Sequence, residues 1–300
     1  MTLWYDLTGQ PSEAEAQAVR TALRGFNAEA GFPADRRPLA ALLRDADAAV
    51  IGGLVGQTSW RWLYIETLAV PDGMRGNGWG RRLMAAAEAE ARRRGCIGAR
   101  VDTYSFQARG FYERHGYAVV GRIDDCPPGQ TRFSLAKRLD GAAAAGDPWP
   151  NATAPEVFIA AGDQTSEALN RVILDGLTAH ATEAAGPAGD RPFKLEVRLP
   201  GEPAPAGGLT GYSFFGWMFV HLFHLPAALR GRGLGSALMA RVEAEARARG
   251  CTGIWLDTFS FQARPFYERL GYRVFATLED FPPGHSRHYL MKRLNHDGDA

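Results

Sequence analysis

The sequence predicts two tandem domains of the α/β (α+β) class, each built on one sheet flanked by helices. The chain has 300 residues, which is room for about two domains of ~150 residues. Residues 75–139 match residues 230–294 at 39 of 65 positions without a gap. This period is far longer than a solenoid repeat, so each copy is a whole domain. Strand and helix patterns interleave within each copy, which gives the class.

The domain division follows from the repeat and from one stretch of small residues. Residues 141–155 are mostly Ala, Gly, Pro and Asp, with little to bury, and this composition is typical of a linker. We therefore expect an N-terminal domain at 1–140, a linker at 141–155 and a C-terminal domain at 156–300.

The elements of one copy are expected in a fixed order that the second copy repeats. Ser12 can cap a helix that runs to about Ala30, where Gly31 and Pro33 end it. Strand patterns follow on both sides of a turn at 56–59. The remaining elements are a helix at 79–94, a strand at 99–103, a helix at 106–115, and strands at 117–123 and 132–139.

The helix at 79–94 has the clearest periodicity. Four apolar residues share one face, which predicts that this face packs on the sheet: Leu83, Met84, Ala87 and Ala91. Gly95 can adopt the left-handed backbone conformation that commonly ends a helix. The Arg92–Arg94 run is expected to be a solvated helix end rather than a nucleic-acid patch, because no aromatic residues interleave with it.

Composition and charge limit what the chain can be. It is 46% hydrophobic, which is typical of globular proteins. Its net charge of +1 gives no overall electrostatic field that would steer the chain onto nucleic acid. It shows no apolar run long enough for a membrane span and no signal-peptide pattern. Cys96, Cys126 and Cys251 are too few for a disulfide framework, and no Cys/His spacing offers a metal site. We expect a cytoplasmic protein with no metal, nucleic-acid or membrane partner.

A glycine-rich segment between a strand and a helix is the first candidate binding site. Glycines recur at spacing two in both copies, as Gly76, Gly78 and Gly80 and as Gly231, Gly233 and Gly235. Such a loop brings backbone N–H groups close to a ligand at the positive end of a helix, which favours an anion such as a phosphate or pyrophosphate. Arg75 and Arg230 can add charge-assisted contacts. The alternative is an ordinary glycine-rich turn.

The spacing of this segment separates it from two other phosphate-binding loops. It is not GxxxxGK[ST], which excludes an NTPase loop. It is GxGxG rather than GxGxxG, although Asp102 and Asp257 follow at the distance of a ribose-binding acid. The Phe-Tyr-Glu-Arg helix that comes next is not the continuation of a dinucleotide-binding fold, so a dinucleotide-dependent oxidoreductase is disfavoured.

Two motifs in order resemble the GCN5-related N-acetyltransferase (GNAT) family. They are Leu68-Ala-Val-Pro-x-x-x-Arg75-Gly-x-Gly-x-Gly80 and Ala108-x-x-Phe-Tyr-Glu-x-x-Gly-Tyr117, and the second copy matches both. The resemblance covers nearly both copies and implies a mixed, mostly antiparallel sheet with acetyl-CoA in a split between strands. It also implies that the Arg-x-x-Gly-x-Gly loop binds the pyrophosphate.

The resemblance places a general base on the strand before the glycine loop. Glu66 stands four residues before Val70, and His221 four before Leu225. Strand alternation puts Glu66 beside Trp62, Tyr64 and Leu68 and puts His221 between Phe219 and Phe223, and apolar neighbours would raise the pKa of the carboxyl. The alternatives are a solvated or ion-paired glutamate and a hydrogen-bonded core histidine.

Further roles come from the resemblance alone. Tyr112 and Tyr267 match the tyrosine that protonates the departing thiolate, although each could instead pack its helix on the sheet. The backbone near Leu68 and Val70, and near Phe223 and Leu225, would polarise the thioester carbonyl. Acidic pairs before each Pro-Pro-Gly, at 124–125 and 279–280, would attract a cationic amine or lie in solvated turns.

The expected function is transfer of an acetyl group from acetyl-CoA to a primary amine of a small molecule or protein, by direct attack in a ternary complex. The alternative is an acetyl-CoA sensor or scaffold in which one or both domains are silent. Glu66 and His221 differ, so the two domains need not share an activity. The sequence predicts no particular acceptor or oligomeric state.

Overall fold

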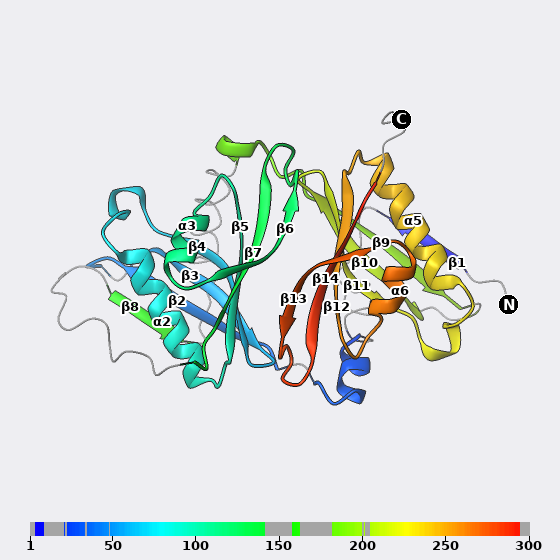
Figure 1. Cartoon of the computed structure of the whole chain (residues 1–300), viewed down its shortest axis with the longest axis horizontal. Coiled ribbons are helices and arrows are strands. Elements are labelled where there is room, and N and C mark those ends of the chain that lie inside the picture. The colour runs from blue at the N-terminus through cyan, green and yellow to red at the C-terminus, as the bar shows by residue number, and fades with distance from the viewer. Residues whose placement is uncertain are drawn as a thin grey trace.

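The computed structural model describes residues 4–8, 21, 23–33, 35–47, 49–141, 158–162, 182–199, 201 and 205–294. These residues form two seven-stranded sheets that lie side by side, with helices on their outer faces (Figure 1). The fold class predicted from the sequence is confirmed. No helix among these residues is both long and apolar enough to span a membrane.

The elements of the two repeats correspond one to one. The first repeat contains β2 (Arg37–Arg44), β3 (Val50–Ser59), β4 (Trp62–Ala69), η1 (Asp72–Met74), α2 (Trp79–Arg93), β5 (Gly98–Tyr104), α3 (Arg109–Arg114), β6 (Ala118–Asp124) and β7 (Thr131–Arg138). The second contains β9 (Arg191–Arg198), β10 (Gly207–Phe214), β11 (Trp217–His224), η2 (Ala227–Leu229), α5 (Leu234–Ala248), β12 (Gly253–Phe259), α6 (Arg264–Arg269), β13 (Arg273–Glu279) and β14 (Ser286–Arg293).

The sheets are mixed and mostly antiparallel. The first has the order β6-β7-β5-β4-β3-β2-β8 and the second β13-β14-β12-β11-β10-β9-β1, where β8 is Phe158–Gly162 and β1 is Trp4–Thr8. Among the described strands, each sheet has one parallel pair, β4 with β5 and β11 with β12.

The repeats exchange their first strands. β1, from the start of the chain, pairs with β9 of the second sheet, and β8 pairs with β2 of the first sheet. Figure 1 shows β1, in blue, beside the yellow-to-red repeat and β8, in green, beside the cyan repeat. The expected division at 1–140 and 156–300 assigned each first strand to its own repeat. The described sheets instead each contain one strand from the other repeat.

The strand boundaries near residue 56 differ from the expectation. Residues 56–59 are not a turn; they lie inside β3, and the turn falls at Trp60 and Arg61, both with positive φ. Gly56 is a glycine because a Cβ there would overlap the carbonyl oxygen of Tyr64 on the neighbouring strand. The predicted start of the first helix lies outside the described residues, but residues 23–29 are helical.

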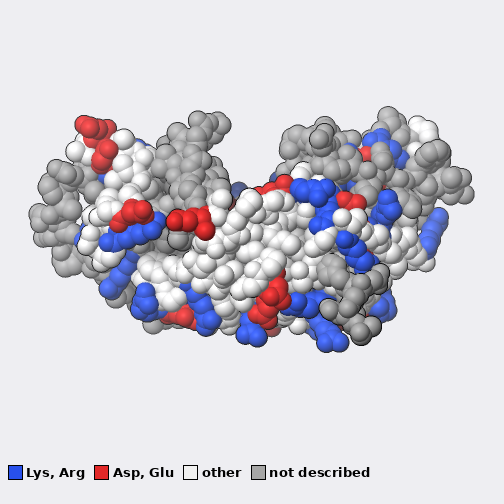
Figure 2. Space-filling model, turned by 90° about the horizontal axis from the view of Figure 1, so that it is seen from above, with Lys and Arg blue, Asp and Glu red and all other residues white. Residues whose placement is uncertain are grey.

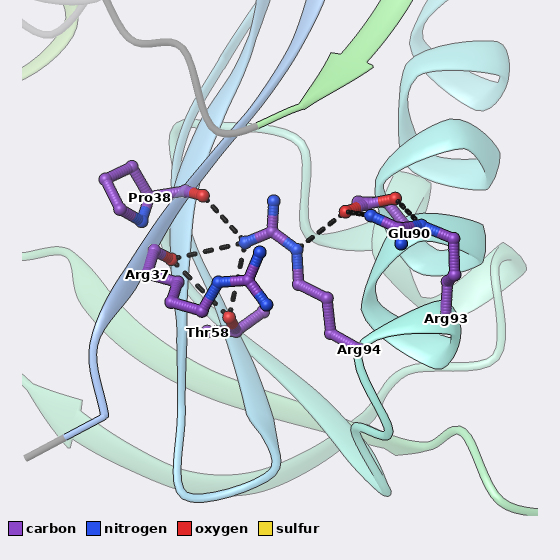
Figure 3. Close-up of polar contacts among 6 residues, drawn as sticks. All are labelled: Arg37, Pro38, Thr58, Glu90, Arg93 and Arg94. Carbon is purple, nitrogen blue, oxygen red and sulfur yellow. Dashed lines mark hydrogen bonds and ion pairs between the residues drawn. The ribbon is translucent and has the colours of Figure 1, made fainter.

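The C-terminal end of α2 holds the helix on the sheet. The apolar face predicted for this helix is buried, as expected. Arg94, expected in solvent, is 2% exposed. Its guanidinium donates to the Glu90 carboxylate at 2.7 Å and to the Pro38 carbonyl at 2.7 Å (Figure 3). A buried cation needs such partners, and Arg249 repeats the arrangement with Glu245 and the carbonyl of Arg191.

The interface between the repeats has approximate twofold symmetry in its contacts. The Trp62 indole donates to the Asp280 carbonyl at 2.9 Å, and the Trp217 indole donates to the Asp125 carbonyl at 2.9 Å. The Asp280 and Asp125 carboxylates each form a 3.1 Å ion pair with an arginine of the other repeat, Arg138 and Arg293 respectively. The aspartates proposed as attractors of an amine therefore hold the repeats together.

Buried charges lie next to this interface. The Asp102 carboxylate is 3.1 Å from the Arg132 guanidinium, and the Asp257 carboxylate is 2.8 Å from that of Arg287. The Arg132 guanidinium also lies 4.2 Å from the centre of the Trp255 ring in the other repeat. Burial raises the pKa of each aspartate, but the arginines outweigh it, so both pKa values are lowered.

The face seen in Figure 2 carries Lys and Arg interspersed with Asp and Glu, with a broad uncharged area across its middle. Neither sign of charge dominates this face. Two exposed ion pairs, Arg109 with Glu113 and Arg264 with Glu268, are i,i+4 contacts on the short helices α3 and α6 and contribute little to stability.

Gly121→Ala is expected to destabilise the interface. A Cβ at Gly121 of β6 would overlap the Cβ of Ala276 on β13, and such overpacking costs about 1–3 kcal/mol. Thermal unfolding should show a lower midpoint for Gly121→Ala and recovery in the Gly121→Ala, Ala276→Gly double variant. An unchanged midpoint in the single variant would contradict this packing of β6 on β13.

Asp257→Asn is expected to lower the free energy of unfolding by about 3–5 kcal/mol, because Arg287 stays buried without its partner. The pKa of Asp257 is lower when folded, so its contribution to stability is present above the unfolded pKa of about 4 and is lost as pH falls through the folded pKa. Urea titrations from pH 7 to pH 3 should show that the free energy of unfolding falls less with decreasing pH in the variant than in the wild-type chain. A parallel pH dependence in both proteins would rule out this contribution.

Candidate functional site

Each sheet is split at the end of its parallel pair. β4 pairs with β5 only from Trp62 opposite Gly98 to Ile65 opposite Val101, and β11 pairs with β12 only as far as Val220 opposite Leu256. β4 continues to pair with β3 on its other side as far as Ala69. One edge of the strand's last residues therefore has no pairing strand in the described structure, and its backbone groups face the split.

A β-bulge marks the start of the split in both repeats. Val55 pairs with Thr67 and Gly56 with Ile65, so Glu66 is the extra residue of β4. In the second repeat, His221 is the extra residue of β11 in the same way. A bulge redirects a side chain, and here it leaves both side chains exposed. The two candidate bases therefore occupy equivalent positions.

Because of the bulge, the side chains that follow it lie on the opposite side of the strand from the one that regular alternation predicts. Leu68 does not share the side of Glu66, because the extra residue returns it to the core face with Leu63 and Ile65. Phe223 likewise packs with Met218 and Val220. A period of two holds only while the strand is regular. The sequence expectation that Leu68 and Phe223 flank the bases is wrong.

Glu66 lies among groups that act on its pKa in opposite directions. Partial desolvation raises the pKa of Glu66, while a hydrogen bond from the Gln57 amide at 2.7 Å and the charges of Arg100 and Arg36 lower it; the net shift is upward. The direction matches the sequence expectation. Gln57 was missed because its role depends on cross-strand pairing near the bulge.

His221 stands at the end of a series of stacked side chains. Its ring lies 5.7 Å from that of Phe219, and Phe219 lies 3.9 Å from Trp255, both in stacked geometry. The imidazole also acts electrostatically on Asp257, helping to lower the pKa of that carboxyl. The first repeat has Tyr64 and Arg100 in place of Phe219 and Trp255, with the guanidinium 3.7 Å from the ring centre. The two bulge residues thus have different surroundings.

The glycine loops follow the open strand ends and begin α2 and α5. Gly78 and Gly233 are the N-cap residues, with φ of 83° and 77°, and neither helix has a side-chain cap or an acidic residue in its first turn. A Cβ at either glycine would meet nothing within 4 Å. The first-turn amides, which have no partner inside the helix, therefore face open space suited to an anion.

The remaining glycines of each loop have separate structural reasons. Gly76 and Gly231 also have positive φ, at 78° and 71°. Gly80 allows close packing, since a Cβ there would lie 3.2 Å from the Phe111 ring, and Gly235 does the same with Phe266. The third glycine thus brings α3 or α6 against the start of the loop helix.

The arginine before each glycine loop donates a hydrogen bond to the backbone of its own repeat. The Arg75 Nε donates to the Val70 carbonyl at 3.1 Å, and the Arg230 Nε donates to the Leu225 carbonyl at 2.7 Å. Arg75 also pairs with Asp72 at 2.8 Å. Each arginine therefore closes the turn between the open strand and the glycine loop, which fixes the position of the helix start.

Tyr112 and Tyr267 lie in the cores of their repeats. The Tyr112 ring contacts Phe111 at 5.2 Å, and Tyr267 contacts Phe266 at 5.0 Å. Burial raises the pKa of Tyr112 to about 12 and raises that of Tyr267 as well. Both phenols are therefore protonated at neutral pH. Both tyrosines pack in the core, and the phenylalanine beside each tyrosine joins it to the glycine loop.

No group of three or more His, Cys, Asp or Glu side chains able to hold a metal ion occurs in the described parts of the chain. The cysteines Cys96, Cys126 and Cys251 are free and buried. They belong to the three large core clusters, so each packs in the hydrophobic core.

Comparisons with known proteins point to one family. The model of the acetyltransferase (GNAT) family matches residues 4–117 and 183–272. An acetyltransferase from Agrobacterium fabrum, Atu2258, is 42% identical over 129 residues, which are 43% of this chain and 94% of that protein. The blasticidin-S acetyltransferase of Streptomyces morookaense is 53% identical over 89 residues, 29% of this chain and 65% of that protein.

A solved structure of an acetyltransferase from Bacillus cereus ATCC 14579 is 25% identical, with a TM-score of 0.41, and covers 43% of this chain and 94% of its own. The family model matches more than half of the chain and touches both repeats. The chain therefore belongs to the acetyltransferase (GNAT) family.

Proposed function

We propose that each repeat binds acetyl-CoA and transfers its acetyl group to a primary amine of a small molecule. The observation that carries the proposal is the shared geometry of the two repeats: an open strand edge, then a glycine loop, then an uncapped helix start. The loop amides at Gly76, Gly78 and Gly80, and at Gly231, Gly233 and Gly235, would hold the pyrophosphate of the coenzyme.

The open strand edge would receive the acyl end. Backbone groups at Leu68 and Val70, and at Phe223 and Leu225, would align the thioester and polarise its carbonyl. Arg75 and Arg230 already hold the strand end to the loop. They keep the pyrophosphate position and the thioester position at a fixed separation, which is what direct transfer to a bound amine requires.

The bulge residues would remove the proton of the amine. An alkyl amine with a pKa of ~10.4 is only about 0.1% neutral near pH 7.4, an unfavourable ~4 kcal/mol, so a base assists attack. Glu66 has a raised pKa and an exposed carboxylate at the split. His221 would take the same role in the second repeat. Tyr112 and Tyr267, protonated at neutral pH, would donate a proton to the departing thiolate.

The acceptor class is proposed from the relatives. One relative is named as a blasticidin-S acetyltransferase, so blasticidin S is the first amine to assay beside polyamines and amino acids. The three free cysteines fit a reducing environment, and we place the reaction in the cytoplasm. A thiol-release assay with acetyl-CoA over this panel tests the function, and no release with any amine would overturn it.

Calorimetry with acetyl-CoA tests the two binding sites. The wild-type chain should bind two equivalents, and Gly78→Val or Gly233→Val should each leave one. The physical reason is that a β-branched residue is strained at a φ near +80° and would fill the space beside the helix start.

Gly95→Val is the matched control for this stoichiometry. Gly95 has a φ of 78° and open surroundings, but it lies past the other end of α2. Two equivalents should therefore remain, despite similar backbone strain. Retention of both sites in the Gly78→Val, Gly233→Val double variant would refute binding at the glycine loops.

Gln57→Leu should shift the acid limb of the kcat/KM pH profile of the first repeat to higher pH. The Gln57 hydrogen bond lowers the pKa of Glu66, so its loss moves the pH at which the base becomes ionised upward, by about half a unit or more for a ~1 kcal/mol bond. The profile is measured in the Gly233→Val background, where the second site is silent. A limb that stays in place, or moves down, would show that Glu66 is not the titrating base.

A further inference from the structure

We propose that residues 26–32 of the first repeat, here called the crossing segment, form a wall of the acceptor site of the second repeat. The inference rests on the proposed function, because it assigns the specificity of that same site. Figure 1 shows the blue helix that contains the start of this segment under the yellow-to-red repeat, away from the sheet of its own repeat.

One end of the crossing segment lies against the strand side of the split. The Phe26 ring is 6.5 Å from the ring of His224, the last residue of β11. The Arg230 guanidinium lies 5.1 Å from the centre of the Phe26 ring. Phe26 therefore sits beside both the open strand end and the arginine that closes the glycine loop.

The other end lies against the opposite side of the split. The Gln262 amide, just after β12, donates to the Asn27 side-chain oxygen at 2.9 Å. The Phe32 ring stacks on Phe261 at 4.6 Å and meets His285 edge-on at 4.8 Å. His285 belongs to the loop between β13 and β14. The segment thus contacts β11, the end of β12 and the last loop of the second repeat, which together surround the split.

The first repeat holds the crossing segment in place. The Trp60 indole donates to the Pro33 carbonyl at 2.9 Å, and the Trp60 amide donates to the Asp35 carboxylate at 2.8 Å. The Trp60 ring then packs edge-on against Phe259 of the second repeat at 4.9 Å. Because its support comes from one repeat and its contacts from the other, the wall exists only in the joined chain.

The wall differs between the two sites. In the reciprocal direction, Ala185 and Ala188 of the second repeat pack, as do Tyr104 and Phe106 of the first, against a core cluster that contains residues of both repeats. Phe26 and Phe32 are partly exposed, so the crossing segment presents aromatic surface at the second site, whereas residues 182–190 of the second repeat include no aromatic residue. The second site should favour an amine attached to a planar or apolar group, and the first should not.

The test uses variants in which one site is silent. Phe26→Ala, Phe32→Ala is placed in the Gly78→Val background, where only the second site binds acetyl-CoA, and in the Gly233→Val background, where only the first does. Initial rates are measured with phenethylamine, spermidine and blasticidin S. In the first background the KM for phenethylamine should rise at least fivefold, with the KM for acetyl-CoA within twofold. In the second background neither constant should change.

Two controls separate this effect from general damage. Phe106→Ala removes a phenyl ring of the first repeat that packs on Tyr104 and Phe215 rather than on the crossing segment, and should leave the second-site KM values unchanged. The rate at which diethyl pyrocarbonate modifies His224 and His285, mapped by mass spectrometry, should rise in the Phe26→Ala, Phe32→Ala chain if the rings cover these side chains. Asn27→Ala, a milder change at the same segment, should raise the same KM in a chain of unaltered melting temperature.

The outcomes distinguish the inference from the proposed function. An effect confined to the first site, an equal effect at both sites, or no effect at either would overturn the crossing segment as a wall of the second site. Absence of turnover with every amine in the wild-type chain would overturn the proposed function itself.

Discussion

The site of each repeat depends on one extra residue in a strand. The bulge at Glu66 or His221 occurs where the parallel pair ends, and it is possible because Gly56 or Gly211 stands on the neighbouring strand, where a Cβ would overlap the carbonyl of Tyr64 or Phe219. The bulge turns a polar side chain toward the split and returns the next residues to the core face. Strand, glycine loop and helix start then follow in a fixed relation.

The glycine loop and the helix that follows it could be predicted, because short-range sequence patterns specify them. The glycine spacing and the apolar face of α2 are short-range patterns, and the structure has them where the sequence placed them. The exchange of β1 and β8 was not predictable, because pairing between distant edge strands leaves no periodic signal. Arg94 and Asp125 were assigned to solvent or ligand because their partners, the Pro38 carbonyl and Arg293, are far away in the sequence.

The two repeats share the same arrangement of strands and helices but carry different side chains at equivalent positions. On the sheet face opposite the long helices, Ala40 and Leu42 of β2 correspond to Lys194 and Glu196 of β9, a buried ion pair at 2.9 Å. The Glu196 carboxylate also pairs with the Arg198 guanidinium at 2.6 Å, so a charged network stands where the first repeat has Ala40 and Leu42. Together with Glu66 against His221, these differences make the two sheets chemically distinct, although the glycine loops are alike.

The exchanged strands also bear on how the chain folds as it is made. The first sheet ends in β8, so it lacks an edge strand until residue 162 has left the ribosome, while β1 is synthesised first and its partner β9 comes almost two hundred residues later. Contacts of such long sequence separation are slow to form. The N-terminal strand must therefore stay unpaired through most of translation, and the first sheet can be complete well before the second.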